Sequence, residues 1–381
     1  MGHLRVFESV PNFSEGRRAE VIAEIAGGAA HAHVLDVDAD VDHNRVVVSL
    51  AGEGPRIVDA LAASVRVAAQ RIHLREHSGV HPRVGAADVI PIVPLGQASL
   101  AAARELAREL GERIWNELRI PVFFYGHGEK DTLADIRAGR VRPTLGGPEL
   151  HASAGAVCIG ARPLLLAFNV LLPGLDLKSA RALARSLRES AGGLRGVQAL
   201  VFELPPVDLT SDERIQLSLN LFRLDETSPS AVITELERRG VEVGRQQVIG
   251  LCPTFAALPA AGGRLLEARL AAAAAQRGAE LCAARGDDEH TRLAGRLEQE
   301  AGDLARIGVD QGEMLAGAER MAALVHVLKA AGVLRPELEA MLEIAARGFR
   351  SALDRDTLSR HATRIGALDH RLGEVPKPRG P

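Results

Sequence analysis

The chain has 381 residues, roughly two and a half times a typical domain of about 150, so it needs two or three hydrophobic cores and cannot be a single small module. Lys and Arg number 46 against 49 Asp and Glu, and this formal net charge of −3 disfavours a general nucleic-acid binder. Only 3% of the residues are aromatic, so a planar ligand would find few rings on which to stack.

Apolar runs of strand length alternate with helix-period segments as far as about residue 260, which is the pattern of an α/β protein. In the first part of the chain we expect strands at 4–9, 34–38, 45–50, 89–94 and 121–125, and helices at 17–29, 55–72 and 100–118. Residues 135–148 are rich in Gly, Arg and Pro and are predicted to form a loop. These elements make one layered subdomain, residues 1–155.

A second subdomain, residues 156–261, shows an independent pattern. Its expected strands are 164–172, 197–204, 215–221 and 243–251, with helices at 177–190 and 230–239. The order β-α-β-β-α-β is typical of a ferredoxin-like sheet with helices on one face. The strands of the first subdomain begin in a similar order, so the two could lie side by side with a ligand between them.

The last segment, residues 262–381, has apolar residues at helical spacing and few prolines. We expect an all-helical extension that serves stability or oligomerisation, and the sequence gives it no further role. The predicted fold class is therefore α/β (α+β), with two layered subdomains followed by helices.

The cysteines, Cys158, Cys252 and Cys282, are widely spaced and form no CxxC pair, which indicates neither a disulfide framework nor a thiolate metal site. The first ten residues lack the basic and apolar segments of a signal peptide, and no run approaches about 18 apolar residues. We expect a cytoplasmic protein that does not bind membranes.

His73, His77 and His81 are spaced by four residues, which could place them on one helix face as metal ligands. Gly79 and Pro82 interrupt a helix at this point, so we expect no metal site. His81 should instead lie on a loop before a buried strand. An imidazole with an ordinary pKa of about 6.5 can act there as a general acid or base, or can be merely structural.

Four alternating aspartates precede a polar tripeptide: Asp36, Asp38, Asp40 and Asp42, then His43, Asn44 and Arg45. A calcium loop that began at Asp36 would need Gly and Glu at its sixth and twelfth positions, where Val41 and Val47 stand. The pattern therefore disfavours calcium. The acids either orient a cation or a histidine, or form a solvated turn.

The segment 11–17, Pro-Asn-Phe-Ser-Glu-Gly-Arg, joins the first strand to the first helix. Ser14 is the expected helix N-cap, and the free N–H groups beyond it either bind a carboxylate or are simply capped. The chain has no Gly-rich phosphate loop of the P-loop or dinucleotide type, which disfavours ATP and NAD.

Five motifs now occur in order along residues 4–260: VPNFSEG at 10–16, LDVDADVDHNR at 35–45, HSGVHPRVGAADVIPIVPL at 77–95, GARPLLLAFNVLL at 160–172 and VIGLCP at 248–253. Together they resemble the formiminotransferase family, whose animal members are fused to a cyclodeaminase.

The resemblance implies two α/β subdomains with a tunnel between them. It implies transfer of the formimidoyl group of N-formimidoyl-L-glutamate to N5 of tetrahydrofolate, in histidine degradation, with tetrahydrofolate as co-substrate and no metal. The expected partners are these small molecules and a second copy of the chain, a homodimer, but not nucleic acid.

The resemblance also assigns residues. His81 matches the active-site histidine of the family, and Asp38 matches the aspartate beside it. One histidine can accept the proton of the attacking amine and deliver it to the departing glutamate. Asn12, Asn44 and Arg83 are candidates for binding the substrate.

The segment that contacts folate in the family corresponds here to ten residues: Gly146, Gly147, Pro148, Glu149, Leu150, His151, Ala152, Ser153, Ala154 and Gly155. In relatives it carries bulky aromatics where this chain has Leu150 and Ala154. Phe13, Phe123 and Phe124 are the nearest alternative rings for stacking on the pterin.

Two other functions fit the same residues. A related transfer could use a formyl donor, N-formylglutamate or 5-formyltetrahydrofolate, because formyl and formimidoyl groups differ only by O for NH. Alternatively, the chain could bind folate without catalysis. The segment 262–381 lacks the Gly-rich opening of the cyclodeaminase, so we expect no second, ammonia-releasing activity.

Overall fold

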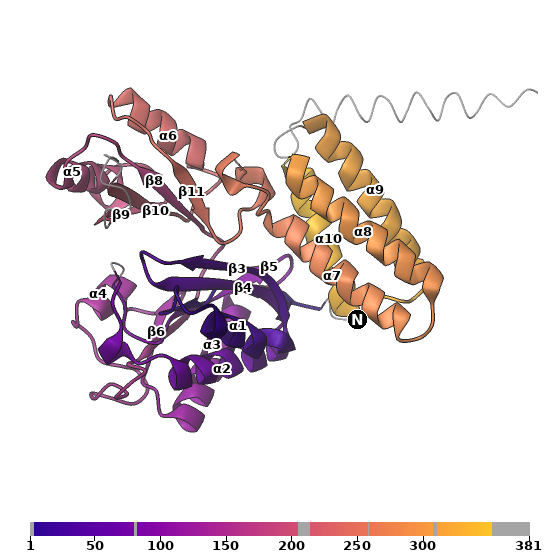
Figure 1. Ribbon diagram of the computed structural model, residues 1–381, viewed down its shortest axis with the longest axis horizontal. Coiled ribbons are helices and arrows are strands. Elements are labelled where there is room, and N and C mark those ends of the chain that lie inside the picture. Colours follow the sequence, from indigo (N-terminus) through magenta and orange to yellow (C-terminus); the bar gives the residue numbers. More distant parts are fainter. Residues whose placement is uncertain (1–3, 80–81, 205–213, 258, 308–310, 353–381) are drawn as a thin grey trace, which may run out of the picture.

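The computed structural model describes residues 4–79, 82–204, 214–257, 259–307 and 311–352. Two α/β units and a helical bundle make up this part of the chain (Figure 1). The first unit contains β1 (Val6–Ser9), β2 (Asn12–Phe13), α1 (Ala19–Gly28), β3 (His33–Asp40), β4 (Arg45–Glu53), α2 (Gly54–Arg71), β5 (Ala87–Leu95), α3 (Leu100–Leu118), β6 (Val122–Gly126), α4 (Leu133–Arg137) and β7 (Val157–Ala161).

The sheet of the first unit has the order β3, β4, β1 and β2, β5, β7, β6. Both β1 and β2 pair with β4 and with β5, so they are successive halves of one interrupted strand. The strands from β1 to β5 and the helices α1 and α2 follow the order β-α-β-β-α-β, and α3 leads on to β6, which is parallel to β7.

The second unit contains β8 (Leu166–Leu171), α5 (Leu177–Leu187), β9 (Val197–Glu203), β10 (Ile215–Leu221), α6 (Pro229–Arg238) and β11 (Gln246–Ile249). Its four strands pair antiparallel in the order β11, β8, β10, β9, which confirms the predicted ferredoxin-like unit. The two units therefore repeat one topology.

The boundary expected at residue 155 differs from the structure. β7 (Val157–Ala161) pairs in parallel with β5 and β6 of the first sheet, so the first unit extends through residue 161. The short strand escaped the sequence analysis because its five residues, VCIGA, show no alternation and adjoin a long loop. The expected loop 135–148 also contains most of α4 (Leu133–Arg137).

Each sheet buries one face under its own helices. On β4 the side chains of Val46, Val48 and Leu50 pack under α1 and α2, whereas Val47 and Ser49 point to the other face. In the second sheet the leucines of β10 point to the helices and its Gln216, Ser218 and Asn220 to the opposite side.

The polar faces of the two sheets are turned towards each other. In Figure 1 the helices α1, α2 and α3 lie on the side of the first sheet that is remote from the second unit, and α6 lies on the far side of the second sheet. The ring of His43 meets the ring of Phe202 edge-on, with centroids 5.5 Å apart. The N–H of Gly250 donates to Oδ2 of Asp38 at 3.0 Å.

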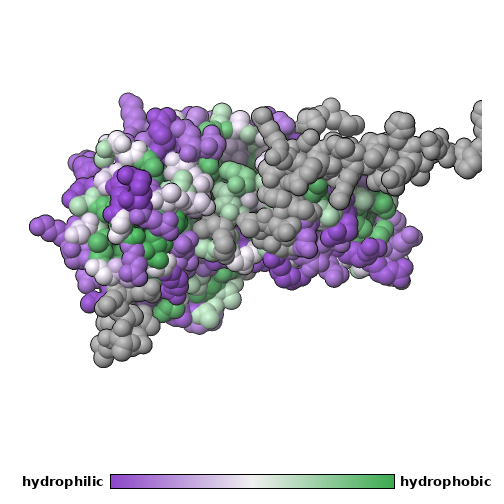
Figure 2. All heavy atoms as spheres, turned by 90° about the horizontal axis from the view of Figure 1, so that it is seen from above, coloured by the Kyte–Doolittle hydropathy of each residue, from purple (hydrophilic) through white to green (hydrophobic). Residues whose placement is uncertain are grey.

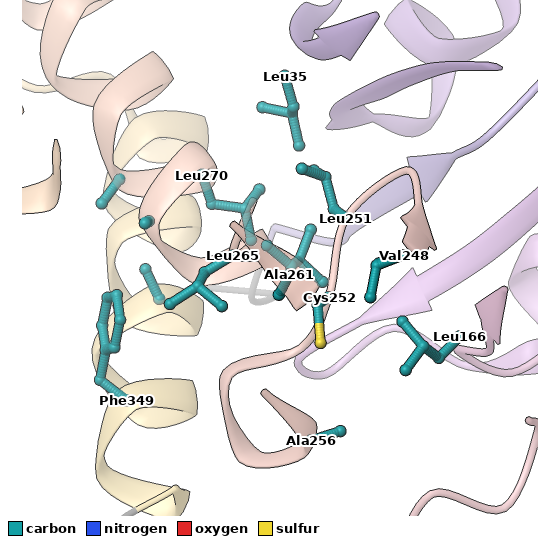
Figure 3. Close-up of a cluster of buried hydrophobic side chains, with 14 of the residues drawn as sticks. Leu35, Leu166, Val248, Leu251, Cys252, Ala256, Ala261, Leu265, Leu270 and Phe349 are labelled. Atoms are coloured by element: carbon teal, nitrogen blue, oxygen red, sulfur yellow. The ribbon is translucent and has the colours of Figure 1, made fainter. Parts of the chain in front are cut away.

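The remaining helices, α7 (Leu266–Ala283), α8 (Asp288–Ile307), α9 (Gln311–Ala330) and α10 (Pro336–Ser351), form the predicted helical extension as a bundle (Figure 1). Its core is continuous with that of the second unit and with the edge of the first sheet. Figure 3 shows Leu35, Leu251, Cys252, Leu270 and Phe349 around one apolar centre.

The bundle also makes polar contacts with the first unit and with the segment that follows β11 of the second unit. The carboxylate of Glu337 on α10 accepts the N–H of Glu53 at 3.1 Å and lies 3.8 Å from Nε2 of His33. The carboxylate of Glu267 on α7 accepts both the N–H and the hydroxyl of Thr254, at 2.8 and 2.7 Å. The bundle is thus an integral layer of the fold.

All three cysteines are buried and free. Among the described residues, no helix combines the length and the apolar composition needed to cross a membrane. On the face shown in Figure 2, hydrophilic residues outline both ends of the molecule and hydrophobic residues lie between them in small groups.

Because Phe349 is fully buried where the bundle meets the α/β units, Phe349→Ala should lower the free energy of unfolding by about 3–5 kcal/mol. Denaturant unfolding measures this change. Val327→Ala, on α9 and 45% exposed, is the control and should change stability by no more than about 0.5 kcal/mol. Equal stability of the two variants would show that the bundle does not share the core.

Candidate active site

The side chain of Asn44 joins three of the sequence motifs. Its Oδ1 accepts the N–H of Gly16 at 2.9 Å, and its Nδ2 donates to the carbonyl of Ser78 at 2.9 Å. The neighbouring backbones are too close for larger residues, since a Cβ on Gly16 would lie 2.1 Å from the carbonyl oxygen of Asp40. Segments far apart in the sequence therefore meet at one point.

The segment expected to contact folate joins the same site through backbone hydrogen bonds. The N–H of Ala86 donates to Ala154 at 2.9 Å, and the N–H of Ala156 donates to Val84 at 3.0 Å. On the other side, the N–H of Ser14 donates to Ala86 at 2.8 Å. The segment 146–155 thus lies beside residues 82–86, which follow His81 directly.

The prediction that Ser14 caps the first helix is wrong. The Ser14 hydroxyl donates to the carbonyl of Gly85 at 2.8 Å, and α1 begins only at Ala19. Oε1 of Glu15 accepts the N–H groups of Arg17 and Arg18, both at 2.9 Å. Burial raises the pKa of Glu15, but these N–H groups and Arg18 outweigh it and hold the pKa below its ordinary value. These donors are thus already occupied by a carboxylate of the chain.

The alternating aspartates orient a histidine and an arginine, as one of the two interpretations expected. Asp40 accepts the N–H of His43 at 2.7 Å and lies 3.0 Å from its Nδ1. Asp36 and Asp38 both lie 2.7 Å from Nη2 of Arg264, which comes from the start of the helical extension.

A buried ion network that the sequence analysis missed lies under the site. Asn12 opposes Val89 and Phe13 opposes Ala87, so Asp88 is an extra, bulged residue of β5. Its carboxylate is 0% exposed and accepts from Arg45 at 2.8 Å, from Arg137 at 3.2 Å and from the N–H of Val84 at 2.7 Å.

The pKa of Asp88 follows from these contacts. Burial raises it, but the charges of Arg45 and Arg137 and the N–H of Val84 prevail and lower it below the ordinary value. A signal was present in the sequence, because an aspartate inside the apolar run ADVIPIVPL must be paired if it is buried.

Several guanidinium groups gather at this site. Arg83 is partly exposed and donates to the carbonyl of Gly79 at 2.5 Å. Burial lowers its pKa, the charges of Arg45 and Arg17 lower it further, and Asp88 opposes them. Guanidinium groups form paired hydrogen bonds with carboxylates, so the arrangement favours a carboxylate ligand.

Most of the predicted site residues lie in this region, but not all are free to act as predicted. His81, with Val80, lies outside the described residues. Asn12 accepts from Nε of Arg45 at 2.9 Å and donates to the carbonyl of Val10 at 2.9 Å. The amides of Asn12 and Asn44 thus hold the loops of the site together, and the side chain of Arg83 is partly exposed.

The candidate rings for stacking are in the core. Phe13, Phe123 and Phe124 are at most 4% exposed, so none offers its face to a pterin. Phe202, which the sequence analysis did not name, is only partly buried and lies on the polar side of β9 against His43. Leu150, in the segment 146–155, is 50% exposed.

A hollow of about 460 Å³ opens elsewhere, between Phe7 of β1, Gly54 of α2 and Leu106 of α3. It lies on the helix side of the first sheet, and no residue expected in the site lines it. Among the described residues, no three His, Cys, Asp or Glu side chains are grouped to hold a metal ion.

Two sheets with opposed polar faces, and an arginine-rich site where loops of the first unit meet, define a two-unit α/β protein whose site is suited in charge to anionic ligands. A profile of the formiminotransferase domain, N-terminal subdomain, matches residues 6–162, in agreement with the end of β7.

The glutamate formimidoyltransferase of Thermoplasma acidophilum is 34% identical over 283 residues, which cover 68% of this chain and 91% of the relative. That of Streptococcus pyogenes is 32% identical, covering 68% and 92%. The formimidoyltransferase-cyclodeaminase of Rattus norvegicus is 33% identical, and the match covers 52% of its length. The chain belongs to the formiminotransferase family.

Replacing the buried Asp88 by Asn leaves two half-buried arginines, Arg45 and Arg137, without their counter-charge. The variant should lose about 3–5 kcal/mol of unfolding free energy near pH 7. Because the native pKa of Asp88 is lowered, its contribution is present above the unfolded value, about 3.9, and is lost as the pH falls towards the native pKa. Urea titrations should therefore show the two proteins converging below about pH 4; a gap that is constant with pH would contradict the assignment.

Proposed function

We propose that this chain is a glutamate formimidoyltransferase, a one-carbon transferase that moves the formimidoyl group of N-formimidoyl-L-glutamate to N5 of tetrahydrofolate. The observation that carries the proposal is the convergence of the family motifs around Asn44, beside an excess of guanidinium groups. The glutamate formimidoyltransferases that resemble the chain over most of their length support the same reaction.

The substrates explain the charge of the site. N-formimidoyl-L-glutamate carries two carboxylates, and the folate carries more on its glutamyl end. Arg83 is the proposed ligand for a substrate carboxylate, with Arg17 adding positive potential beside it. Asn12 and Asn44 hold the loops in place for this contact. Holding both substrates in one orientation supplies part of the rate.

The proposed chemistry is acid–base catalysis of addition to the trigonal formimidoyl carbon, through a tetrahedral intermediate. N5 of tetrahydrofolate attacks the formimidoyl carbon and forms the new C–N bond. His81 takes the proton from N5 and returns it to the glutamate nitrogen as the old C–N bond breaks. Asp38 orients this histidine or stabilises its cation. Tetrahydrofolate is a co-substrate here, and the proposed steps use no metal.

For folate we propose the segment 146–155, and for stacking on the pterin we propose Phe202, a partly exposed ring that packs against His43. The backbone contacts of Ala154 and Ala156 with residues 84–86 support a location of the folate next to the catalytic loop. We further propose a cytoplasmic homodimer that acts in histidine degradation.

Purified protein should form 5-formimidoyltetrahydrofolate from N-formimidoyl-L-glutamate and tetrahydrofolate. The change in absorbance of the folate measures the reaction. His81→Ala should lower kcat by about 10²–10⁴-fold with little change in KM, because only the proton transfer is lost.

His326→Ala, on an exposed face of α9, is the control and should keep wild-type rates. Activity only with N-formylglutamate or 5-formyltetrahydrofolate would assign the related formyl transfer instead. Folate binding without turnover of any donor would identify a non-catalytic binder.

Leu150 tests the folate segment. Leu150→Ala should raise KM for tetrahydrofolate about three- to tenfold, since roughly 1 kcal/mol of apolar contact is lost, and should leave KM for the formimidoyl donor unchanged. Steady-state kinetics with each substrate varied in turn distinguish these effects. Equal changes in both constants would count against a folate-specific role.

A further inference from the structure

Arg264 connects the helical extension to the aspartates of the first sheet. It lies between Ala261, the last residue of a short 3₁₀ helix, and α7. Its Nη2 lies 2.7 Å from Oδ2 of Asp36 and 2.7 Å from Oδ2 of Asp38. The same oxygen of Asp38 accepts the N–H of Gly250 at 3.0 Å.

The backbone of Arg264 is itself fixed to the core. Its carbonyl accepts the N–H of Cys252 at 2.8 Å, and the N–H of Leu266 donates to the carbonyl of Cys252 at 2.9 Å. Cys252 and Leu266 are both buried. The guanidinium is thus presented from a rigid support and is only 24% exposed.

Asp38 lies in a row of residues that are paired across neighbouring strands of the first sheet and that includes Asn12. It is directly opposite Val47, which is opposite Asn12, which in turn is opposite Val89. Residues paired in this way share one face of the sheet, and two strand spacings put Asp38 and Asn12 about 10 Å apart. Among the described residues no hydrogen bond is made to Oδ1 of Asp38, so Oδ2 is held and Oδ1 can accept from a further partner.

We infer that Arg264 is a positioning residue for the transfer reaction, acting through Asp38. This inference rests on the proposed function, in which Asp38 assists the catalytic base. Arg264 has two effects. It fixes the orientation of the Asp38 carboxylate, and its charge offsets the repulsion between Asp36 and Asp38. The helical extension thereby contributes to the active site of the first unit.

Three full-length variants separate geometry from charge. Arg264→Met removes both, and kcat should fall about tenfold or more while both KM values stay within about twofold. Arg264→Lys keeps the charge and should recover most of kcat. Arg264→Gln keeps a hydrogen-bond donor without the charge and should be intermediate.

The pH dependence of kcat/KM distinguishes a positioning role from a purely structural one, because a purely structural role would leave it unchanged. Loss of Arg264 leaves the negative charge of Asp38 uncompensated, which favours the protonated form of the base that Asp38 assists and raises the pKa of that base. The acid limb of kcat/KM should therefore move up by about half a pH unit or more in Arg264→Met and Arg264→Gln, and should stay in place in Arg264→Lys.

Arg269 supplies the matched control. It is on α7, 45% exposed, with Nη2 3.8 Å from Oδ1 of Asp36, and it does not contact Asp38. Arg269→Met should keep both kcat and the pH profile. Thermal unfolding of every variant identifies effects of stability alone; if Arg264→Met does not fold, the contrast between the Gln and Lys variants decides.

Wild-type kcat and pH profile in Arg264→Met, or a loss of activity that only follows the loss of folded protein, would overturn the inference. Failure of the wild-type protein to transfer the formimidoyl group would instead overturn the proposed function. The two failures are therefore distinguishable.

Discussion

Two hydrogen bonds from the side-chain amide of Asn44 hold the site together. One reaches the turn at Gly16 and the other the loop at Ser78, and both partners are backbone groups. Asn44 has a φ of +47°, a left-handed conformation that Asn adopts more readily than most residues. Backbone groups removed from water must be paired, so this side chain, together with the hydrogen bonds of Ser14 to Gly85 and Ala86, fixes the relative positions of these loops.

Charge sets the chemistry of the site that these loops enclose. Asp88 is buried at a β-bulge, and its carboxylate pairs with both Arg45 and Arg137. Arg17 and Arg83 lie nearby, so Asp88 neutralises only part of the positive charge around it. Buried charges are costly unless they are paired, and the excess of guanidinium groups is most readily compensated by an anionic ligand. Substrates with several carboxylates match that requirement.

The helical bundle, which lies in the last third of the chain, is part of the fold of both α/β units. Relatives match 68% of the sequence, yet the bundle shares its apolar core with the second unit and with the edge of the first sheet. Through Arg264 it reaches the aspartates of β3, and through Glu337 it reaches the end of β4. Stability and site geometry are therefore linked across the junction.

The sequence by itself determined the alternation of elements, the ferredoxin-like second unit and the motifs, because periodicity and turn residues act locally. α3 and β10 have the predicted bounds. The sequence could not determine that β7 joins the first sheet. It also could not determine that Glu15, and not Ser14, accepts the N–H groups before the first helix. Nor could it pair Asp88 with Arg45 and Arg137, or Asp38 with Arg264. These outcomes depend on contacts between residues up to 226 positions apart for Asp38 and Arg264, which exist only once the sheets and the bundle have packed.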